Sequence, residues 1–307
     1  MSEYIIETQG LTKKFGKSIG IENVDMHVKK GEIYGLVGKN GAGKTTIMKL
    51  LCGIISPTGG KMKILGEEFT GTVTSVGERI GNILETPAFF PYLSAKDNLE
   101  YYRKQKGIPD KNKVDEIIKY VGLENAGKKT FKQFSLGMKQ RLGFAYALLG
   151  DPDILILDEP TNGLDPQGII HFRETIIRLA REKQITVIIS THILGELSQL
   201  ATVYGFIKNG HLLQEIDAQE ILESCKHHLL INVKEPLKAT TILEEQFHTK
   251  EYEVIENKSI KLFSHLDRVE EINEALVLGG ARVTGIQEVK GNLEEYYMNI
   301  MGEEKNA

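Results

Sequence analysis

The fold is decided by the stretch Gly38-Lys39-Asn40-Gly41-Ala42-Gly43-Lys44-Thr45, which has the pattern G-x-x-x-x-G-K-[ST]. It follows the apolar run Ile33–Val37 and precedes the helical run Thr46–Leu51, so the sequence predicts a strand, a glycine-rich loop and a helix. Glycines let backbone N–H groups converge on phosphate oxygens, and the helix points its positive end at the same anion. We expect Lys44 to reach the β- and γ-phosphates of a nucleotide and Thr45 to ligate Mg²⁺. An ordinary glycine-rich turn is the alternative, which the flanking elements disfavour.

A second apolar strand, expected at Ile154–Leu157, ends in two adjacent carboxylates, Asp158 and Glu159. Apolar residues at successive positions are typical of a central strand that is covered on both faces. The two carboxylates suggest separate duties, in which Asp158 holds Mg²⁺ through water and Glu159 polarises the attacking water as a general base. A plain acidic turn is the alternative, and the upstream phosphate loop favours the nucleotide site.

Composition and charge exclude several classes of protein. The chain has 307 residues, 41% hydrophobic and 26% charged, which is typical of a globular protein of about two domains. Its 38 Lys and Arg against 42 Asp and Glu give a net charge of −4, so no global field favours nucleic acid. Cys52 and Cys225 are too few for a disulfide framework, which favours a reducing compartment. No signal peptide or membrane-spanning run is visible, so a membrane role would need another chain to provide the span.

The order of elements predicts two domains, at 1–217 and 218–307. The first alternates strands and helices, which indicates an α/β domain with a largely parallel sheet. Asn209-Gly210 is typical of a type I′ hairpin. The second follows the order β-α-β-β-α-β of a small ferredoxin-like module. Its strands are expected at His228–Val233, Tyr252–Ile255, Ile260–Ser264 and Ala281–Gln287, and its helices at Leu237–Phe247 and Arg268–Leu278.

Two further stretches carry a family resemblance. Asp158–Pro166, preceded by Phe134–Arg141, strongly resembles the ATP-binding cassette of ABC transporters, over about residues 4 to 215. The resemblance implies a P-loop NTPase with a RecA-like parallel-sheet core and with antiparallel β and helical subdomains, the latter at about 86–150. Together with the second domain, this predicts an α/β cassette followed by a small α+β C-terminal module. It also implies an ATPase that works as two cassettes facing head to tail. Each cassette supplies its phosphate loop to one site and its signature loop to the other.

The family's functional residues carry over by motif. Phe15 matches the aromatic residue that stacks on adenine, and Ser135 and Gly137 match signature residues that contact the γ-phosphate on the partner cassette. His192 matches the switch histidine that orients water. The nucleotide-binding residues are therefore expected to be Phe15, Gly38, Lys39, Asn40, Gly41, Ala42, Gly43, Lys44, Thr45, Thr46, Ser135 and Gly137. The catalytic residues are expected to be Lys44, Glu159 and His192, and the metal ligands Thr45, Asp158 and Glu85.

Simpler interpretations stay open for several of these residues. Phe15 is alternatively an aromatic residue that anchors a turn, and His192 a structural histidine. Ser135 is alternatively only the N-cap of the following helix. Asp165 matches a loop aspartate that crosses the cassette interface, and it too is alternatively a helix N-cap.

Two departures from the family pattern point to a subgroup. Phe134–Met138 stands where the family usually has Leu-Ser-Gly-Gly-Gln, and Glu85 stands where it has a glutamine that senses Mg²⁺. These features, with the closing helix expected at Leu293–Met301, resemble exporters that protect bacteria against bacitracin and lantibiotic peptides. The resemblance implies ATP and Mg²⁺ as cofactors, a separate membrane permease and a second cassette as partners, and a place at the cytoplasmic face of the membrane. No nucleic acid partner is expected.

Other functions remain as alternatives. A soluble cassette that grips the ribosome or another macromolecule usually carries two phosphate loops, whereas this chain has one. A small-molecule kinase would not explain Phe134–Arg141 or Ser190-Thr191-His192. An exporter of a different hydrophobic compound is also open. The aromatic segment Thr86–Tyr102 is expected to receive a short helix of the permease or, alternatively, to be core of the helical subdomain.

Overall fold

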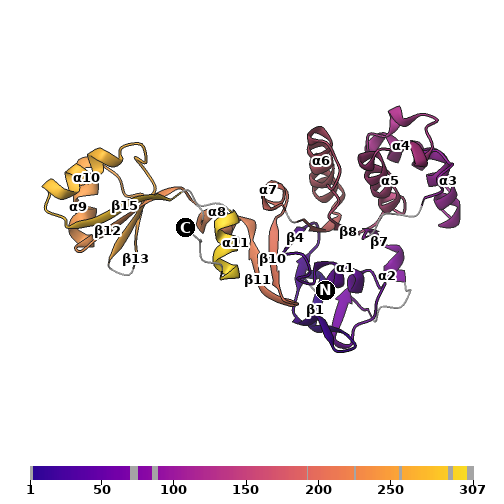
Figure 1. Ribbon diagram of the computed structural model, residues 1–307, viewed down its shortest axis with the longest axis horizontal. Helices are drawn as coiled ribbons and strands as arrows, with labels where there is room; N and C mark the ends of the chain where they lie inside the picture. The colour runs from indigo at the N-terminus through magenta and orange to yellow at the C-terminus, as the bar shows by residue number, and fades with distance from the viewer. Residues whose placement is uncertain are drawn as a thin grey trace. The chain divides into compact units, whose positions relative to one another are not determined.

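The computed structural model describes residues 3–69, 75–84, 89–191, 193–224, 226–255, 258–289 and 293–302 (Figure 1). The chain forms two compact units, Met1–Ala218 and Gln219–Ala307. Each unit has its own sheet and its own cluster of buried apolar side chains.

The centre of the first unit is a six-stranded sheet in the order β11-β10-β4-β9-β8-β7. The five strands from β10 to β7 are parallel, and β11 is an antiparallel edge strand. The bounds are β4 (Ile33–Val37), β7 (Ile80–Ile83), β8 (Ile154–Asp158), β9 (Thr186–Ser190), β10 (Val203–Lys208) and β11 (His211–Asp217). The α/β class and the central place of β8 are confirmed, and Ile154 to Leu157 are fully buried.

The hairpin between β10 and β11 has the backbone that its sequence predicts. Asn209 and Gly210 have φ of 49° and 83°, as a type I′ turn requires. The turn also touches the phosphate loop, because the Gly210 N–H donates to the Ala42 carbonyl at 2.8 Å.

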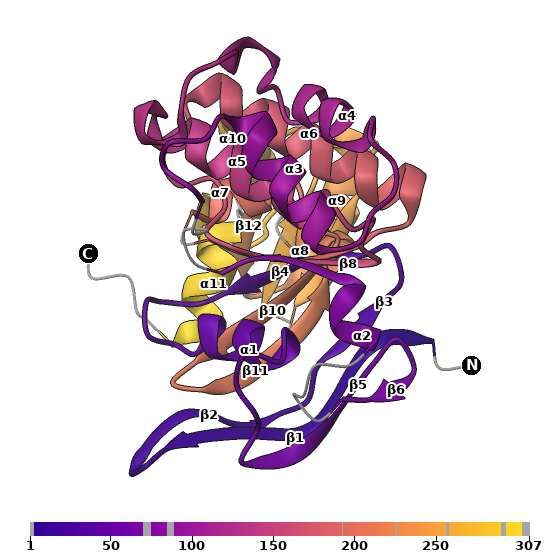
Figure 2. The ribbon, with the colours of Figure 1, turned by 90° about the vertical axis from the view of Figure 1, so that its right-hand side faces the viewer.

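A second sheet is antiparallel and contains β1 (Tyr4–Phe15), β2 (Ser18–Val24), β3 (His27–Lys29), β5 (Gly59–Ile64) and β6 (Glu67–Glu68). Strand β1 continues to Phe15 because its second half pairs with β2. Helix α1 (Lys44–Leu51) packs between the two sheets: its buried Ile47, Met48, Leu50 and Leu51 share one core with residues of β1, β5 and β8. Helix α6 (Pro166–Lys183) lies on the other side of β4 and β8 (Figure 2).

The helical subdomain lies between β7 and β8 in the chain. It comprises α3 (Ala95–Gln105), α4 (Lys113–Tyr120), the short 3-10 turns Glu124–Ala126 and Phe131–Gln133, and α5 (Leu136–Leu148). Its aromatic side chains cluster around Phe89, whose ring centroid lies 5.8 Å from that of Tyr102 and 5.2 Å from that of Phe131. The first unit also contains the short helices α2 (Ser75–Glu78) and α7 (Leu194–Leu197). Helix α8 (Ala218–Ser224) begins at the last residue of this unit.

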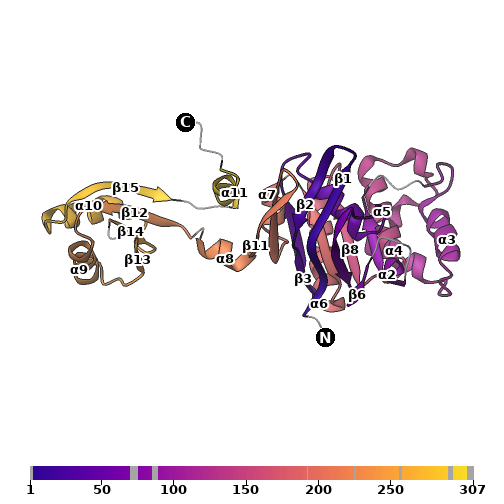
Figure 3. The same cartoon turned by 90° about the horizontal axis from the view of Figure 1, so that it is seen from below.

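The second unit is built on a four-stranded antiparallel sheet and the two helices that pack against it (Figure 3). The strand order is β13-β14-β12-β15, with β12 (His228–Val233), β13 (Tyr252–Ile255), β14 (Ser259–Leu262) and β15 (Val283–Val289). Alternate residues of β12 and β14 share a core with α9 (Pro236–Phe247) and α10 (Val269–Leu278). Helix α11 (Leu293–Met301) follows. Among the residues that the structure describes, no helix is long and apolar enough to cross a membrane.

Replacing Gly81 on β7 by alanine should lower the free energy of unfolding by about 1–3 kcal/mol, because overpacking is costly. A Cβ at Gly81 would lie 2.1 Å from the Ala147 carbonyl oxygen of α5, and neither backbone can shift cheaply. Urea denaturation of the full chain, followed by circular dichroism, measures the change. Gly77→Ala is the matched control, since nothing lies within 4 Å of a Cβ there. Equal midpoints for Gly81→Ala and the unaltered chain would contradict this close packing.

Candidate functional site

The glycine-rich loop connects β4 to α1, and its shape depends on glycine at Gly43. This residue caps α1 at φ 115°, a region that side chains rarely adopt. A Cβ there would also lie 2.8 Å from Ile21 Cγ2 and 3.0 Å from the Gly20 carbonyl oxygen. The loop is therefore pressed against β2. Within it, Lys39, Asn40, Gly41 and Thr45 are exposed, and Thr46 is half-buried.

Lys44 lies inside the loop. Its Nζ donates hydrogen bonds to the Gly38 carbonyl at 2.6 Å and the Lys39 carbonyl at 3.2 Å, and the residue is 6% exposed. Burial lowers the pKa of this ammonium, and the charges of Glu159 and Asp158 oppose that shift. Phosphate oxygens carry negative charge, whereas carbonyl oxygens are neutral. A buried ammonium that donates to carbonyl oxygens therefore forms stronger hydrogen bonds with a bound phosphate.

The carboxylate of Asp158 joins the two halves of the site. Thr45 Oγ1 donates to Asp158 Oδ2 at 2.6 Å, and the Ser190 hydroxyl donates to Asp158 Oδ1. Asp158 and Ser190 are partners in the register of β8 and β9. Because β4, β9 and β8 are parallel neighbours, their carboxyl ends bring these three side chains to one edge of the sheet.

Glu159 follows with a backbone conformation that is unusual for its type. Its φ is 49°, in the left-handed region. Its N–H is held by Ser190, with 3.1 Å to the carbonyl oxygen and 3.2 Å to Oγ. Asn162 Nδ2 lies 3.4 Å from the Glu159 carboxylate. The local bonds therefore fix the direction in which this carboxylate leaves β8.

The starts of two helices lie next to each other beyond this point. Ser135 caps α5 and accepts a hydrogen bond from the Met138 N–H at 3.3 Å. Asp165 caps α6 and accepts from the Gly168 N–H at 3.2 Å. Both N-cap interpretations are therefore correct as local structure, and they leave a further contact with a ligand possible at the same helix ends.

Leu136 makes a contact that the sequence did not predict. It occupies the position of the signature's first glycine, and its side chain lies on Gly163, where a Cβ would be 2.3 Å from Leu136 Cδ2. Gly163 has φ 79°, so both its backbone conformation and the contact with Leu136 require glycine at this position. Arg141 adds an ion pair to Asp165 at 3.8 Å. The signal was present in the departure from the family pattern, but only the fold brings residues 136 and 163 together.

Phe15 ends β1, and the residue is 51% exposed. The ring lies over β2, since a Cβ at Gly20 would be 2.8 Å from Phe15 Cε2, and Gly20 in turn borders Gly43. This exposure favours a stacking role over the alternative of an aromatic residue that anchors a turn from the core. An exposed ring beside a phosphate loop can stack on a planar base.

Two predicted site residues, Glu85 and His192, lie outside the described residues. In the described ranges, no group of three or more His, Cys, Asp or Glu side chains is arranged to hold a metal ion. The structure therefore brings together the loop Gly38–Thr45, Asp158, Glu159 and Phe15, and it places Ser135 and Gly137 at a separate edge with Asp165.

The chain is similar in sequence to ATP-binding proteins of ABC transporters. The family model described as ABC transporter matches residues 21–162. The bacitracin transport ATP-binding protein BcrA of Bacillus licheniformis is 42% identical over 97% of this chain and 97% of its own length. The lantibiotic transport ATP-binding protein SrtF of Streptococcus pyogenes is 43% identical over 71% of this chain and 94% of its own.

Solved structures agree at the level of the cassette. CbiO1 of Clostridium perfringens, described as part of the ABC transporter complex cbiONQ, is 26% identical with a TM-score of 0.65 and covers 72% of this chain and 92% of that one. The bacterial ABC transporter cassette MJ0796, solved as a dimer, is 25% identical with a TM-score of 0.63 and covers 69% and 98%.

The fold and the phosphate loop define a nucleotide-binding cassette of the P-loop class. The chain belongs to the family of ABC transporter ATP-binding proteins, because relatives above 30% identity match it over nearly its whole length. It binds ATP and is an ATPase of this family.

Gly163→Ala should lower ATPase kcat by about tenfold or more, because small displacements at a catalytic edge are costly. The new methyl group would clash with Leu136 and move the loop that leads to Asp165. Steady-state phosphate release measures the effect. Adding Leu136→Ala should restore part of the lost turnover by removing Cδ2 and Cγ. A double variant no faster than Gly163→Ala would show that the clash is not the cause.

Proposed function

We propose that this chain is the ATPase subunit that energises export of bacitracin- or lantibiotic-type peptide antibiotics through a permease on a separate chain. The observation that carries the proposal is the length of the similarity. It extends over 97% of both this chain and the bacitracin transport protein, and so includes the second unit as well as the cassette. The lantibiotic transport protein supports the same class of cargo at 43% identity.

ATP would bind along the loop with its adenine on Phe15 and its phosphates at Gly38–Thr45. Backbone N–H groups and the start of α1 would hold the β- and γ-phosphates, and Lys44 would exchange its carbonyl partners for phosphate oxygens. Thr45 and Asp158 fit a Mg²⁺ ion, since a hydroxyl and a carboxylate 2.6 Å apart are hard oxygen donors. Bound Mg²⁺ would neutralise phosphate charge. Few protein ligands suffice, because phosphates and water complete its coordination.

Glu159 would act as the general base. Its carboxylate takes a proton from a water molecule while the water oxygen attacks the γ-phosphorus, and the bond from that phosphorus to the β,γ-bridging oxygen breaks. The hydrogen bonds from the Glu159 N–H to Ser190 hold the backbone of the base in place next to Asp158. His192 would orient the same water, and Glu85 would reach the metal or its water, as the sequence predicts for both.

A second cassette would complete each site. Ser135 and Gly137 lie with Asp165 at the paired starts of α5 and α6, and Leu136 is 55% exposed there. Helix N-termini attract anions, so this edge can meet the γ-phosphate held by another copy or a paralogue. The dimeric structure of a related cassette supports this arrangement.

The permease would dock on the aromatic surface formed by Phe90, Tyr92 and Tyr101. These residues are 41%, 76% and 47% exposed, whereas Phe89 beside them is buried. The segment 89–102 therefore combines a core anchor with an exposed apolar face, which suits a short amphipathic helix. Such docking would hold the chain at the cytoplasmic face of the membrane, and closure of the cassette dimer would drive transport.

Glu159→Gln should bind ATP but hydrolyse it at least about 100-fold more slowly, because the amide cannot accept the proton. The stalled chain should elute as a dimer on a sizing column with ATP. Lys44→Ala is the control: it should lose ATP affinity and stay monomeric. Fast turnover by Glu159→Gln would overturn the assignment of the base.

Tyr92→Ala combined with Tyr101→Ala should leave ATP turnover of the isolated chain unchanged and uncouple it from the permease. Tagged chain is extracted from membranes of its native host in mild detergent, and the associated proteins are identified. A polytopic membrane protein should be recovered with the unaltered chain, and less of it should be recovered with the double variant. Expressed together, this membrane protein and the chain should confer resistance to peptide antibiotics. Tyr120→Ala, on another face of the subdomain, is the matched control. Recovery of ribosomes or soluble partners alone would contradict the transport function.

A further inference from the structure

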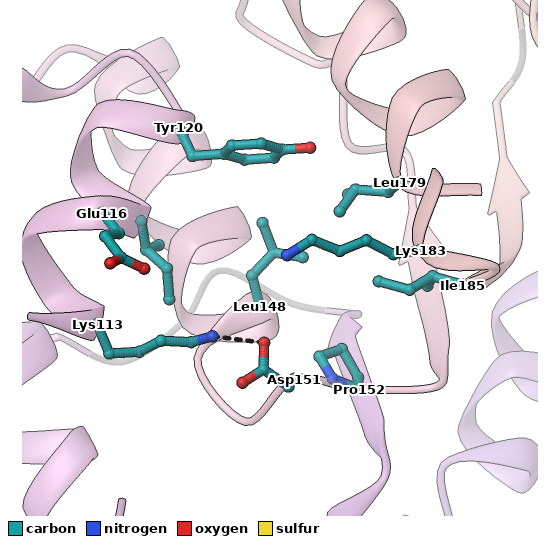
Figure 4. A pocket seen from close by; sticks show the side chains of 10 residues that line it. Lys113, Glu116, Tyr120, Leu148, Asp151, Pro152, Leu179, Lys183 and Ile185 are labelled. Atoms are coloured by element: carbon teal, nitrogen blue, oxygen red, sulfur yellow. Dashed lines mark hydrogen bonds and ion pairs between the residues drawn. The ribbon is translucent and has the colours of Figure 1, made fainter. Parts of the chain in front are cut away.

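A cavity of about 90 Å³ lies in the first unit, at the edge of the sheet opposite the phosphate loop. Figure 4 shows the side chains that line it. Asp151 and Pro152, which border it, precede β8, and Ile185 precedes β9. Asp158 and Ser190 stand at the other ends of the same strands. The cavity is therefore separate from the nucleotide site.

Aliphatic side chains line the inner part of the cavity, and an aromatic ring covers them. Ile117, Leu148 and Leu179 are buried and converge on it from α4, α5 and α6. Tyr120 of α4 lies above Leu148 and Leu179 in Figure 4. Arg178 fixes that ring, since its Nε donates to the Tyr120 hydroxyl at 3.1 Å and its guanidinium carbon lies 4.4 Å from the ring centroid. A flat apolar group fits between a fixed ring and aliphatic walls.

Two lysines border the cavity, and they differ in whether an acidic side chain pairs with them. Lys113 Nζ is held by Asp151 Oδ1 at 2.5 Å. Lys183 instead extends under Tyr120, with its Nζ 6.0 Å from the ring centroid (Figure 4). Within the described part of the chain, no carboxylate lies within ion-pair distance of this ammonium. Glu116 lines the opposite side and disfavours a ligand with two negative charges.

We propose that this cavity binds a small monocarboxylate with a flat apolar body, such as an aromatic acid. The ring occupies the space between Tyr120 and the aliphatic walls, and the carboxylate pairs with Lys183. A monoanion satisfies the ammonium, while the charges of Glu116 and Asp151 disfavour a phosphate-like dianion. The pair forms beside apolar surface, where a charge-assisted hydrogen bond is stronger than in water.

The location gives such a ligand control over turnover. Helix α5 runs from Ser135 to Leu148 at the cavity, and α6 runs from Asp165 to Lys183 at the same place. A ligand that fills the cavity fixes α4 against the ends of both helices and thereby restricts the angle between their starts. This regulatory role rests on the proposed function, whereas binding itself does not.

Benzoate is the probe, titrated into the purified full-length chain and followed by ligand-observed NMR. Saturable binding in the millimolar range is expected, with neutral benzamide and dianionic phenyl phosphate at least about fivefold weaker. Lys183→Met should weaken benzoate by about fivefold or more, and Lys183→Arg should retain it. Ile117→Phe should abolish binding by filling the cavity. Equal benzoate affinity in Lys183→Met and the unaltered chain, or unchanged binding in Ile117→Phe, would overturn the site.

ATPase assays with benzoate test regulation separately. Benzoate should change kcat of the unaltered chain by about twofold or more and leave that of Lys183→Met unchanged. Lys44→Ala should bind benzoate normally, so a failure of the nucleotide site is distinguishable from a failure of the cavity. Saturable binding with no change in turnover would overturn the regulatory role.

Discussion

One carboxylate, Asp158, holds the nucleotide site together. It accepts hydrogen bonds from Thr45, at the start of the helix after β4, and from Ser190, at the end of β9. Three parallel strands must therefore end at the same level for these bonds to form. Glu159 depends on the same arrangement, because its N–H is held by Ser190. The residues proposed to bind phosphate and metal and to act as the base are thus positioned by one local hydrogen-bond network.

Helices α5 and α6 connect two distant parts of the cassette. Helices α5 and α6 begin side by side, joined by the contact of Leu136 with Gly163 and by the ion pair of Arg141 with Asp165. Their other ends meet α4 at the cavity under Tyr120. The edge proposed to face a second cassette and the proposed ligand cavity are therefore opposite ends of the same two helices.

The sequence predicts the parts of this molecule that depend on local pattern. The loop Gly38–Thr45, the buried strand before Asp158 and the type I′ turn at Asn209 all follow from short-range chemistry, and the structure contains each of them. The second half of β1 follows no such local pattern, because strand pairing with β2, rather than apolar alternation, stabilises it. The contact of Leu136 with Gly163, and the approach of Lys183 to Tyr120, join residues far apart in the chain. Such contacts depend on tertiary packing, which no local pattern reports.

The central claim is that two copies complete each other's sites, and mixing two inactive variants tests it most directly. Lys44→Ala disables the phosphate loop, and Ser135→Arg blocks the signature edge. In a mixed dimer, one site combines both defects and the other has neither. An equimolar mixture should therefore show ATPase activity that neither variant shows alone, up to about half of the unaltered activity, because each mixed dimer holds one complete site of two. Full activity of Ser135→Arg alone, or no gain on mixing the two variants, would contradict the account.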